Sequence, residues 1–308
     1  MLSGKLSPRK RSPEDADDRT EIPAIGLGTW QTGGYKCFEA VKSALDQGYR
    51  HIDTAMAYEN EAVVGRAIQQ SSVDRDDIFL TTKIKGYPEF LEPDRLLEAA
   101  DGCLDRLDTE YIDLLLLHWW HPEGEMEETL GAMNQLVESG KVRHIGVSNF
   151  SVDQLQEAMA VSDAPILTNQ VEYHAYWSQD ELLAFCQEND IILTAYSPLA
   201  EGLVVNDSVL SEIGSRYGKS ASQVAIRWLI QQENVVTIPK SVTPSHIREN
   251  LHVFDFELSE AEMQRVRELE GPFWYRQNRE GGQIHRVRST IGPMVERILP
   301  APVFDKIA

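Results

Sequence analysis

The feature that most restricts the possible folds is a series of eight short apolar runs, separated by longer stretches with amphipathic spacing. Most of the runs have the length of a strand buried in a parallel sheet. One such run could equally belong to a buried helix, but eight in alternation favour parallel β-α-β units. The runs are Ala24–Leu27, His51–Asp53, Phe79–Lys83, Leu114–His118, His144–Ser148, Ile166–Gln170, Ile191–Tyr196 and Val235–Ile238.

Helical periodicity occupies the intervals between these runs. Apolar residues recur at steps of three and four over 96–107 and 221–229, and another apolar pattern covers Leu251–Phe256. Ser151 and Ser259 each precede an amphipathic stretch and are suited to cap the first turn of a helix. We therefore predict an α/β protein with a (β/α)8 TIM barrel, followed by an extra helix and a tail at the C-terminus. A doubly wound sheet is the alternative architecture.

The composition divides the chain into three parts. Residues 1–20 are polar and predict a flexible N-terminal tail that could close with a short hairpin. Residues 21–270 contain the alternating units of the barrel, and residues 271–308 form a C-terminal tail. Because Phe273–Tyr275 are three consecutive aromatic residues, which would be unusual on a solvated linker, we expect this tail to shape the substrate pocket. Packing against the side of the barrel is the alternative.

Several classes of protein are disfavoured by the composition. No stretch of 18 apolar residues is present, so we expect no spanning helix, and the basic N-terminal residues lack the apolar segment of a secretory signal. The three cysteines, Cys37, Cys103 and Cys186, lie far apart, which argues against a disulfide framework or a zinc ribbon. We expect a cytoplasmic protein that is a monomer or a weak homo-oligomer.

The charge balance is strongly acidic. The chain has 49 acidic against 29 basic residues and a net charge of −20, so its surface should repel nucleic acid. Only 10 of the basic residues are lysines. An excess of acids with few lysines suggests a halophilic protein that works in high salt, where charge repulsion is screened; an ordinary acidic enzyme is the alternative.

Polar side chains follow seven consecutive apolar runs, where barrel enzymes assemble their active sites. One polar residue at a strand end usually caps a turn, but seven in succession are difficult to explain by capping. The residues are Asp53 and Tyr58, Lys83, His118, Ser148 and Asn149, Gln170, Tyr196 and Ser197, and Lys240 and Ser241.

The first four of these residues indicate proton transfer to a carbonyl oxygen. A neighbouring Lys83 would stabilise the phenolate of Tyr58 and lower its pKa, Asp53 would pair with the lysine, and His118 would orient the carbonyl. With one histidine and one carboxylate, the set is a poor fit for a metal site. It also lacks the serine or cysteine, activated by a histidine, that nucleophilic catalysis requires. To reduce a carbonyl, these four residues would also need a hydride donor. Amide-binding groups for a nicotinamide could come from Ser148, Asn149 and Gln170, with Tyr196 stacked on the ring.

With these residues in view, the sequence resembles the aldo-keto reductase superfamily, and its pattern is most similar to prokaryotic members. Three stretches carry the resemblance: GYRHIDTAMAYENEAVVG (Gly48–Gly65), HIGVSNF (His144–Phe150) and IPKSVTPSHIRENL (Ile238–Leu251). The family implies a (β/α)8 barrel and NADP(H)-dependent reduction of aldehydes or ketones, with some use of NAD(H) left open.

The resemblance also implies roles for individual residues. Asp53, Tyr58, Lys83 and His118 match the catalytic tetrad, in which Tyr58 is the general acid. The matching cofactor-binding positions are Ser148, Asn149, Gln170, Tyr196, Ser197, Leu199, Lys240, Ser241, His246, Glu249 and Asn250. Trp30 and Trp119 match aromatic walls of the substrate pocket, although both could simply be packing residues.

His246 is a departure from the family pattern. It stands where the family usually has an arginine that binds the 2′-phosphate of NADP, so the strength of the preference for NADPH is open. Two other functions also remain open. One is a cofactor-binding regulatory subunit on the same fold, and the other is oxidation of polyols or alcohols, which is the reverse chemistry.

Overall fold

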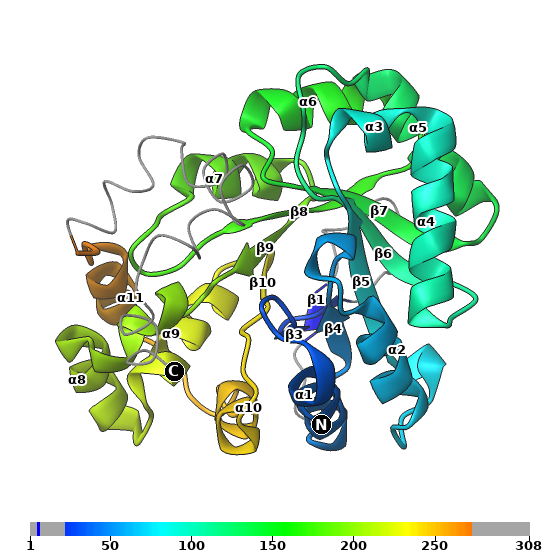
Figure 1. The fold of residues 1–308 in the computed structure, drawn as a ribbon. Coiled ribbons are helices and arrows are strands. Elements are labelled where there is room, and N and C mark those ends of the chain that lie inside the picture. Colours follow the sequence, from blue (N-terminus) through cyan, green and yellow to red (C-terminus); the bar gives the residue numbers. More distant parts are fainter. Residues whose placement is uncertain (1–4, 7–21, 273–308) are drawn as a thin grey trace, which may run out of the picture. The chain divides into compact units, whose positions relative to one another are not determined.

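Eight parallel strands form the central sheet, and each overlaps one of the predicted apolar runs (Figure 1). The computed structural model describes residues 5–6 and 22–272. In chain order the strands are β3 (Leu27–Gly28), β4 (His51–Asp53), β5 (Phe79–Ile84), β6 (Ile112–Leu117), β7 (Val142–Ser148), β8 (Ile166–Glu172), β9 (Ile192–Tyr196) and β10 (Val235–Thr237). Each strand pairs in parallel with the next along the chain, which is the order that successive β-α-β units produce.

The sheet closes on itself between its first and last strands. The Gly26 N–H donates to the Thr237 carbonyl over 2.8 Å, and the Thr237 N–H donates to the Ala24 carbonyl over 2.9 Å. The two backbones approach so closely that a Cβ at Gly28 would lie 2.7 Å from the Ile238 carbonyl oxygen. The predicted (β/α)8 barrel is confirmed, and the alternative of a doubly wound sheet is wrong because an open sheet has no such seam.

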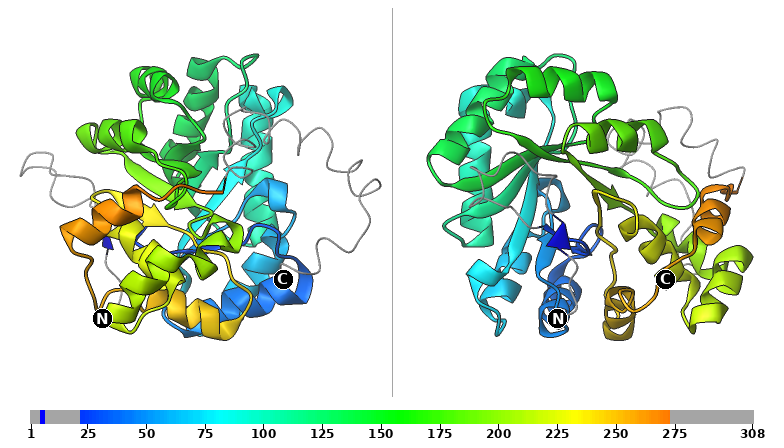
Figure 2. Two further views of the ribbon diagram at one scale, coloured as in Figure 1. Left: turned by 90° about the vertical axis from the view of Figure 1, so that its left-hand side faces the viewer. Right: turned by 180° about the vertical axis from the view of Figure 1, so that it is seen from behind.

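Helices follow the strands and cover the outside of the barrel (Figure 2). The helices are α1 (Gly34–Asp46), α2 (Glu61–Gln69), α3 (Pro88–Leu91), α4 (Pro93–Leu107), α5 (Met126–Glu138), α6 (Val152–Val161), α7 (Asp180–Glu188), α8 (Ser208–Tyr217), α9 (Ala221–Ile230), α10 (Pro244–Leu251) and α11 (Glu260–Arg267). As predicted, Ser151 and Ser259 cap α6 and α11 with full capping boxes. The helical pattern expected over Leu251–Phe256 is wrong, because α10 begins earlier, with Pro244 in its first turn, and ends at Leu251.

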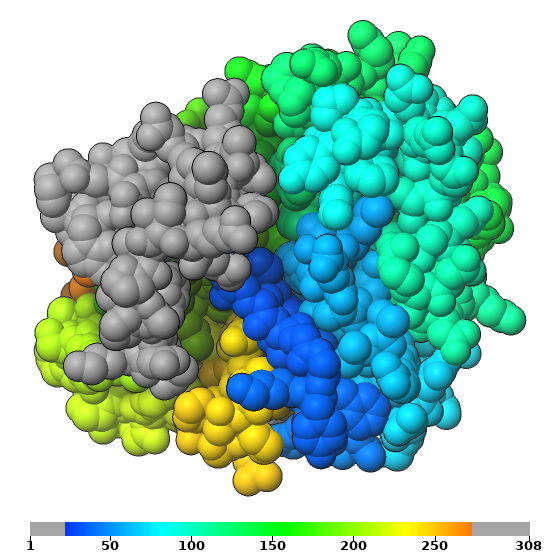
Figure 3. Space-filling model, viewed as in Figure 1, coloured from blue at the N-terminus to red at the C-terminus, as the bar shows by residue number. Residues whose placement is uncertain are grey.

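The outer ring closes where the first helix meets the last barrel helix. Gln47, directly after α1, donates to the Pro244 carbonyl over 3.3 Å, and the Tyr49 hydroxyl donates to the Ile247 carbonyl over 3.0 Å. Figure 3 shows α1 in blue next to α10 in gold on the same face. The barrel is therefore joined at the same place in its inner and its outer layer.

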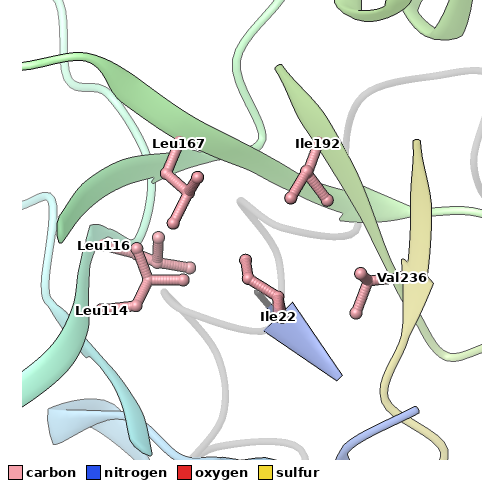
Figure 4. Packing of buried hydrophobic residues seen from close by; sticks show 6 residues of the cluster. All are labelled: Ile22, Leu114, Leu116, Leu167, Ile192 and Val236. Carbon is pink, nitrogen blue, oxygen red and sulfur yellow. The ribbon is translucent and has the colours of Figure 1, made fainter. Parts of the chain in front are cut away.

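A short antiparallel pair lies at the amino end of the barrel strands. Lys5–Leu6 (β1) pairs with Ile22–Pro23 (β2). The Ile22 side chain is fully buried and belongs to an apolar cluster inside the barrel (Figure 4). The other members of this cluster are Leu114, Leu116, Leu167, Ile192 and Val236. Because apolar side chains fill the interior at this end, the active site is expected at the carboxyl ends of the strands.

Parts of the predicted domain scheme lie outside the described residues. This applies to the N-terminal tail apart from β1, and to the C-terminal tail with Phe273–Tyr275 and its predicted role at the pocket. Among residues 5–6 and 22–272, no helix combines the length and the apolar character needed to cross a membrane.

Candidate active site

Lys83 is the centre of a hydrogen-bonded group at the carboxyl ends of β4 and β5. Its side chain is fully buried, and its ammonium donates to Asp53 Oδ1 over 2.6 Å and to the Thr54 carbonyl over 2.8 Å. The hydroxyl of Tyr58, which ends a turn of 3-10 helix over Met56–Tyr58, lies 3.4 Å from Lys83 Nζ. The strands thus place an ion pair directly below a half-buried phenol.

The environment of Tyr58 changes its acidity in the direction opposite to the expected one. Burial raises the pKa of the phenol well above its ordinary value, and repulsion from Asp53 and then Tyr196 raises it further. Burial also lowers the pKa of Lys83, against the opposing effect of Asp53. The prediction that the pKa of Tyr58 is lowered is wrong here, because burial and then the Asp53 carboxylate, 2.6 Å from the lysine, raise it. Tyr58 consequently holds its proton throughout the neutral range.

An aromatic wall continues from Tyr58 across the mouth of the barrel. The imidazole of His118, directly after β6, lies edge-on to the Tyr58 ring with 5.7 Å between ring centroids. Trp119 follows at 4.8 Å from His118, and Tyr87 packs against Trp119 at 5.1 Å. Trp119 therefore belongs to the site. Trp30, the second predicted wall residue, lies after β3 and is 38% exposed.

The predicted amide-binding residues form a second group that is joined to the first. Gln170 donates from its side-chain nitrogen to Asp53 Oδ2 over 2.8 Å, and the Ser148 hydroxyl donates to the Gln170 carbonyl over 2.8 Å. Asn149 donates to the His118 carbonyl over 3.0 Å and accepts from the Tyr196 hydroxyl over 3.0 Å. Four successive strand ends, β6 to β9, are connected in this way.

The chain after β9 adopts an unusual backbone. Ser197 and Ala200 both have positive φ angles, 51° and 47°, and Glu201 and Gly202 continue the left-handed region at 55° and 93°. Leu199 immediately precedes this turn. Residues without glycine's freedom rarely adopt such angles, and clusters of them are typical of ligand-binding loops.

The remaining predicted contacts lie on the segment from β10 to α10, apart from the tetrad. Lys240 and His246 are exposed, and Ser241 lies between them, where its hydroxyl accepts the Thr243 N–H over 3.2 Å. No side chain caps the first turn of α10. Glu249 is exposed, whereas Asn250 is 4% exposed and lies on the barrel side of the helix.

Asn60 is a site residue that the sequence analysis missed. Its side-chain nitrogen donates to the carbonyls of Thr29 and Thr32 over 2.9 and 2.8 Å, and its oxygen accepts the Thr54 hydroxyl over 2.7 Å. The loop with Trp30 is thereby fixed to the loop with Tyr58. The available signal was position alone, since Asn60 lies two residues after Tyr58 in the Gly48–Gly65 motif.

The residues at the β10–α10 segment fit a phosphate-bearing cofactor. Within residues 22–272 no carboxylate pairs with Lys240, and the uncapped N–H groups at the start of α10 favour a negative charge. The polar group around Asn149 suits an amide. No set of three or more histidine, cysteine or acidic side chains that could hold a metal ion occurs in the described parts of the chain.

Comparisons of the sequence with known proteins agree on one family. The model of the Aldo/keto reductase family matches residues 24–270. Glyoxal reductase of Bacillus subtilis is 40% identical over 247 residues, covering 80% of this chain and 88% of that protein. Aldo-keto reductase family 1 member A1 of Gallus gallus is 40% identical over 286 residues, covering 81% and 86% of the two chains.

A solved structure agrees with these sequence matches. The crystal structure of a protein provisionally named 2,5-diketo-D-gluconic acid reductase B is 46% identical, with a TM-score of 0.79. The match covers 82% of this chain and 89% of the other.

Proposed function

The chain belongs to the aldo/keto reductase family, and from this premise we propose that it is an NADP(H)-dependent reductase of aldehydes or ketones. The observation that carries the proposal is the contact of Lys83 with both Asp53 and Tyr58 at the carboxyl ends of the strands, with His118 against the phenol. This arrangement offers one protonated hydroxyl at the bottom of an aromatic-walled site.

We assign Tyr58 as the general acid. Its raised pKa keeps the phenol protonated, so the proton is available when negative charge develops on the carbonyl oxygen. Lys83, which Asp53 holds in place, then stabilises the phenolate that remains, because the ammonium lies 3.4 Å from the hydroxyl oxygen. His118 orients the carbonyl oxygen towards Tyr58.

The nicotinamide cofactor supplies the hydride when it is bound. We propose that Ser148, Asn149 and Gln170 hold its carboxamide and that Tyr196 supports the ring. Ser197 and Leu199 would lie along the pyrophosphate. The adenosine end would be held by Lys240, Ser241, His246, Glu249 and Asn250. This orientation is supported by the uncapped start of α10 and by Lys240, which pairs with no carboxylate within residues 22–272.

A first experiment tests reduction itself. Purified protein is screened for NADPH oxidation with aldehydes, ketoses, diketones and methylglyoxal, and then for the reverse reaction with polyols. We expect reduction to dominate. Saturable NADPH binding without oxidation by any carbonyl would instead favour the regulatory subunit.

A second experiment tests the acid. Tyr58→Phe should lower turnover about 10²- to 10⁴-fold, because the phenol is the proton donor, while the Kd for NADPH stays within about twofold. Tyr35→Phe, at a tyrosine that is 76% exposed on α1, is the matched control. If Tyr58→Phe keeps more than half of the wild-type turnover, another group supplies the proton.

We also propose that the protein is cytoplasmic and that it is a monomer or a weak homo-oligomer. Size-exclusion chromatography with light scattering would test the second.

A further inference from the structure

A second lysine follows Lys83 on the same side of the strand. Lys83 points into the barrel, where it contacts Asp53. β5 ends at Ile84, and if the alternation of side chains along the strand is continued by one residue, Lys85 is placed on the same side as Lys83. The backbone pairing reaches this point, since the His118 N–H donates to the Ile84 carbonyl over 2.9 Å. The rise of two residues, about 7 Å, puts Lys85 one layer nearer the mouth than Lys83.

The residues after Lys85 are held against the aromatic wall. A Cβ on Gly86 would lie 1.7 Å from the Trp119 carbonyl oxygen, so only glycine allows the two backbones to approach so closely. Tyr87 packs edge-on against the Trp119 ring. The backbone next to Lys85 is therefore held against Trp119, which places Lys85 at the His118 and Trp119 end of the site.

The charge of Lys85 has no partner among the residues that the structure describes. The side chain is half-buried, and within the described ranges it forms neither an ion pair nor a hydrogen bond. By contrast, Lys83, Lys141 and Lys219 each have a carboxylate oxygen within 2.6 Å. A substrate anion bound at this end of the site would supply the missing counter-charge.

On the basis of the reductase function above, we propose that Lys85 binds a carboxylate on the substrate. The substrates are then carbonyl compounds that carry a carboxylate a few atoms from the reducible carbon, such as oxo acids and sugar acids. A local cation is needed to bind such an anionic substrate, because a chain with a net charge of −20 otherwise repels anions from its surface.

A matched pair of substrates tests this proposal. The rates of NADPH oxidation with 4-formylbenzoate and 4-formylbenzamide are compared at constant ionic strength, since the two differ in charge but hardly in shape. The same is done with 3-formylbenzoate and 3-formylbenzamide. The variants are Lys85→Met, Lys85→Arg and Lys42→Met. Lys42, in the second half of α1, is also half-buried and forms no ion pair with another described residue, and its loss changes the net charge equally.

We expect wild-type protein to prefer each acid to its amide in kcat/KM by about tenfold. Lys85→Met should remove this preference by raising KM for the acid, with the amide changed less than about twofold. Lys85→Arg should retain it, and Lys42→Met should behave as wild type. Equal use of acid and amide by wild-type protein, or an equal loss of both in Lys85→Met, would overturn the proposal while leaving carbonyl reduction intact.

A binding measurement separates this proposal from the proposed function. If no carbonyl is reduced, quenching of tryptophan fluorescence by 4-(hydroxymethyl)benzoate is titrated in wild type and Lys85→Met. Saturable binding that Lys85→Met weakens about tenfold supports the carboxylate site even then. Absent or unchanged binding rejects it.

Discussion

Asn60 contains no group that could react with a carbonyl, yet all of its side-chain hydrogen-bonding capacity is used to join two active-site loops. Both N–H groups bond to carbonyls of the loop with Trp30, and the oxygen accepts the Thr54 hydroxyl. Because the Thr54 carbonyl in turn accepts a hydrogen bond from Lys83, Asn60 acts on the tetrad indirectly, through Thr54. We regard it as a positioning residue.

Asn60→Asp tests this role with almost no change in shape. The carboxylate loses both donors and faces two carbonyl oxygens, so the free energy of unfolding should fall by about 1–3 kcal/mol in a urea titration. If Asn60 only stabilised the fold, this loss of stability would be the sole effect of the substitution. A positioning role should also raise KM for the carbonyl severalfold, with the Kd for NADPH unchanged. Unaltered KM in folded Asn60→Asp protein would contradict the positioning role.

His246 is the residue that should limit the preference for NADPH. Arginine is always charged and offers a planar fork of donors to a phosphate, whereas an imidazole offers no such fork. We therefore expect only a moderate preference for NADPH over NADH at pH 7. The ratio of the two Kd values, measured by fluorescence, gives the result.

His246→Arg should tighten NADPH binding more than NADH binding. Arg248→Lys serves as the control, since that residue lies two positions on and about 200° around the helix, away from His246. Equal or better catalytic efficiency with NADH at pH 7 would mean that Lys240 and Ser241 do not suffice to select the phosphate.

At the scale of elements, the amino ends of β5, β6 and β7 are joined by one buried carboxylate. Asp113 accepts from the Leu80 N–H over 3.0 Å and pairs with Arg75 at 2.7 Å and Arg143 at 3.0 Å. Both guanidinium groups lie over the Tyr111 ring, at 4.1 and 3.9 Å from its centroid. This cluster lies at the end of the barrel opposite the active site, so it should act on stability alone.

Asp113→Asn should lower the free energy of unfolding by about 2–3 kcal/mol, because two cations lose their shared counter-charge. The control is Arg95→Ala, whose pairing with Glu98 is exposed and should contribute about 0–1 kcal/mol. Urea titrations give both values, and kcat should be unchanged in both variants. A loss of activity in folded Asp113→Asn would show that the two ends of the barrel are coupled.

The sequence predicts the elements better than it predicts their contacts. Apolar runs located all eight strands because buried parallel strands need few polar residues, and serine caps located the starts of α6 and α11. The clamp by Asn60 was not predictable, since its partners are carbonyls of a separate loop that any sequence could supply. The pKa of Tyr58 depends on burial, which a strand-end residue does not reveal.

At the scale of the whole molecule, the dominant quantity is the net charge of −20. Like charges spread over one surface repel each other and oppose the compact state. The described ion pairs compensate only part of the acidic excess, because 49 acids cannot all be matched by 29 bases. Folding should therefore be more favourable wherever ions shorten the range of the repulsion.

We expect the melting temperature to rise by about 4 °C or more between low salt and 2 M KCl, which corresponds to roughly 1–2 kcal/mol for a domain of this size. The Debye length falls to about 3 Å at 1 M, so most of the rise should be complete near that concentration. Sucrose is the control, since it stabilises compact states without screening charge. A melting temperature that stays flat or falls with KCl would identify an ordinary acidic enzyme, and a rise equal to that in sucrose would assign the effect to exclusion of solute from the surface.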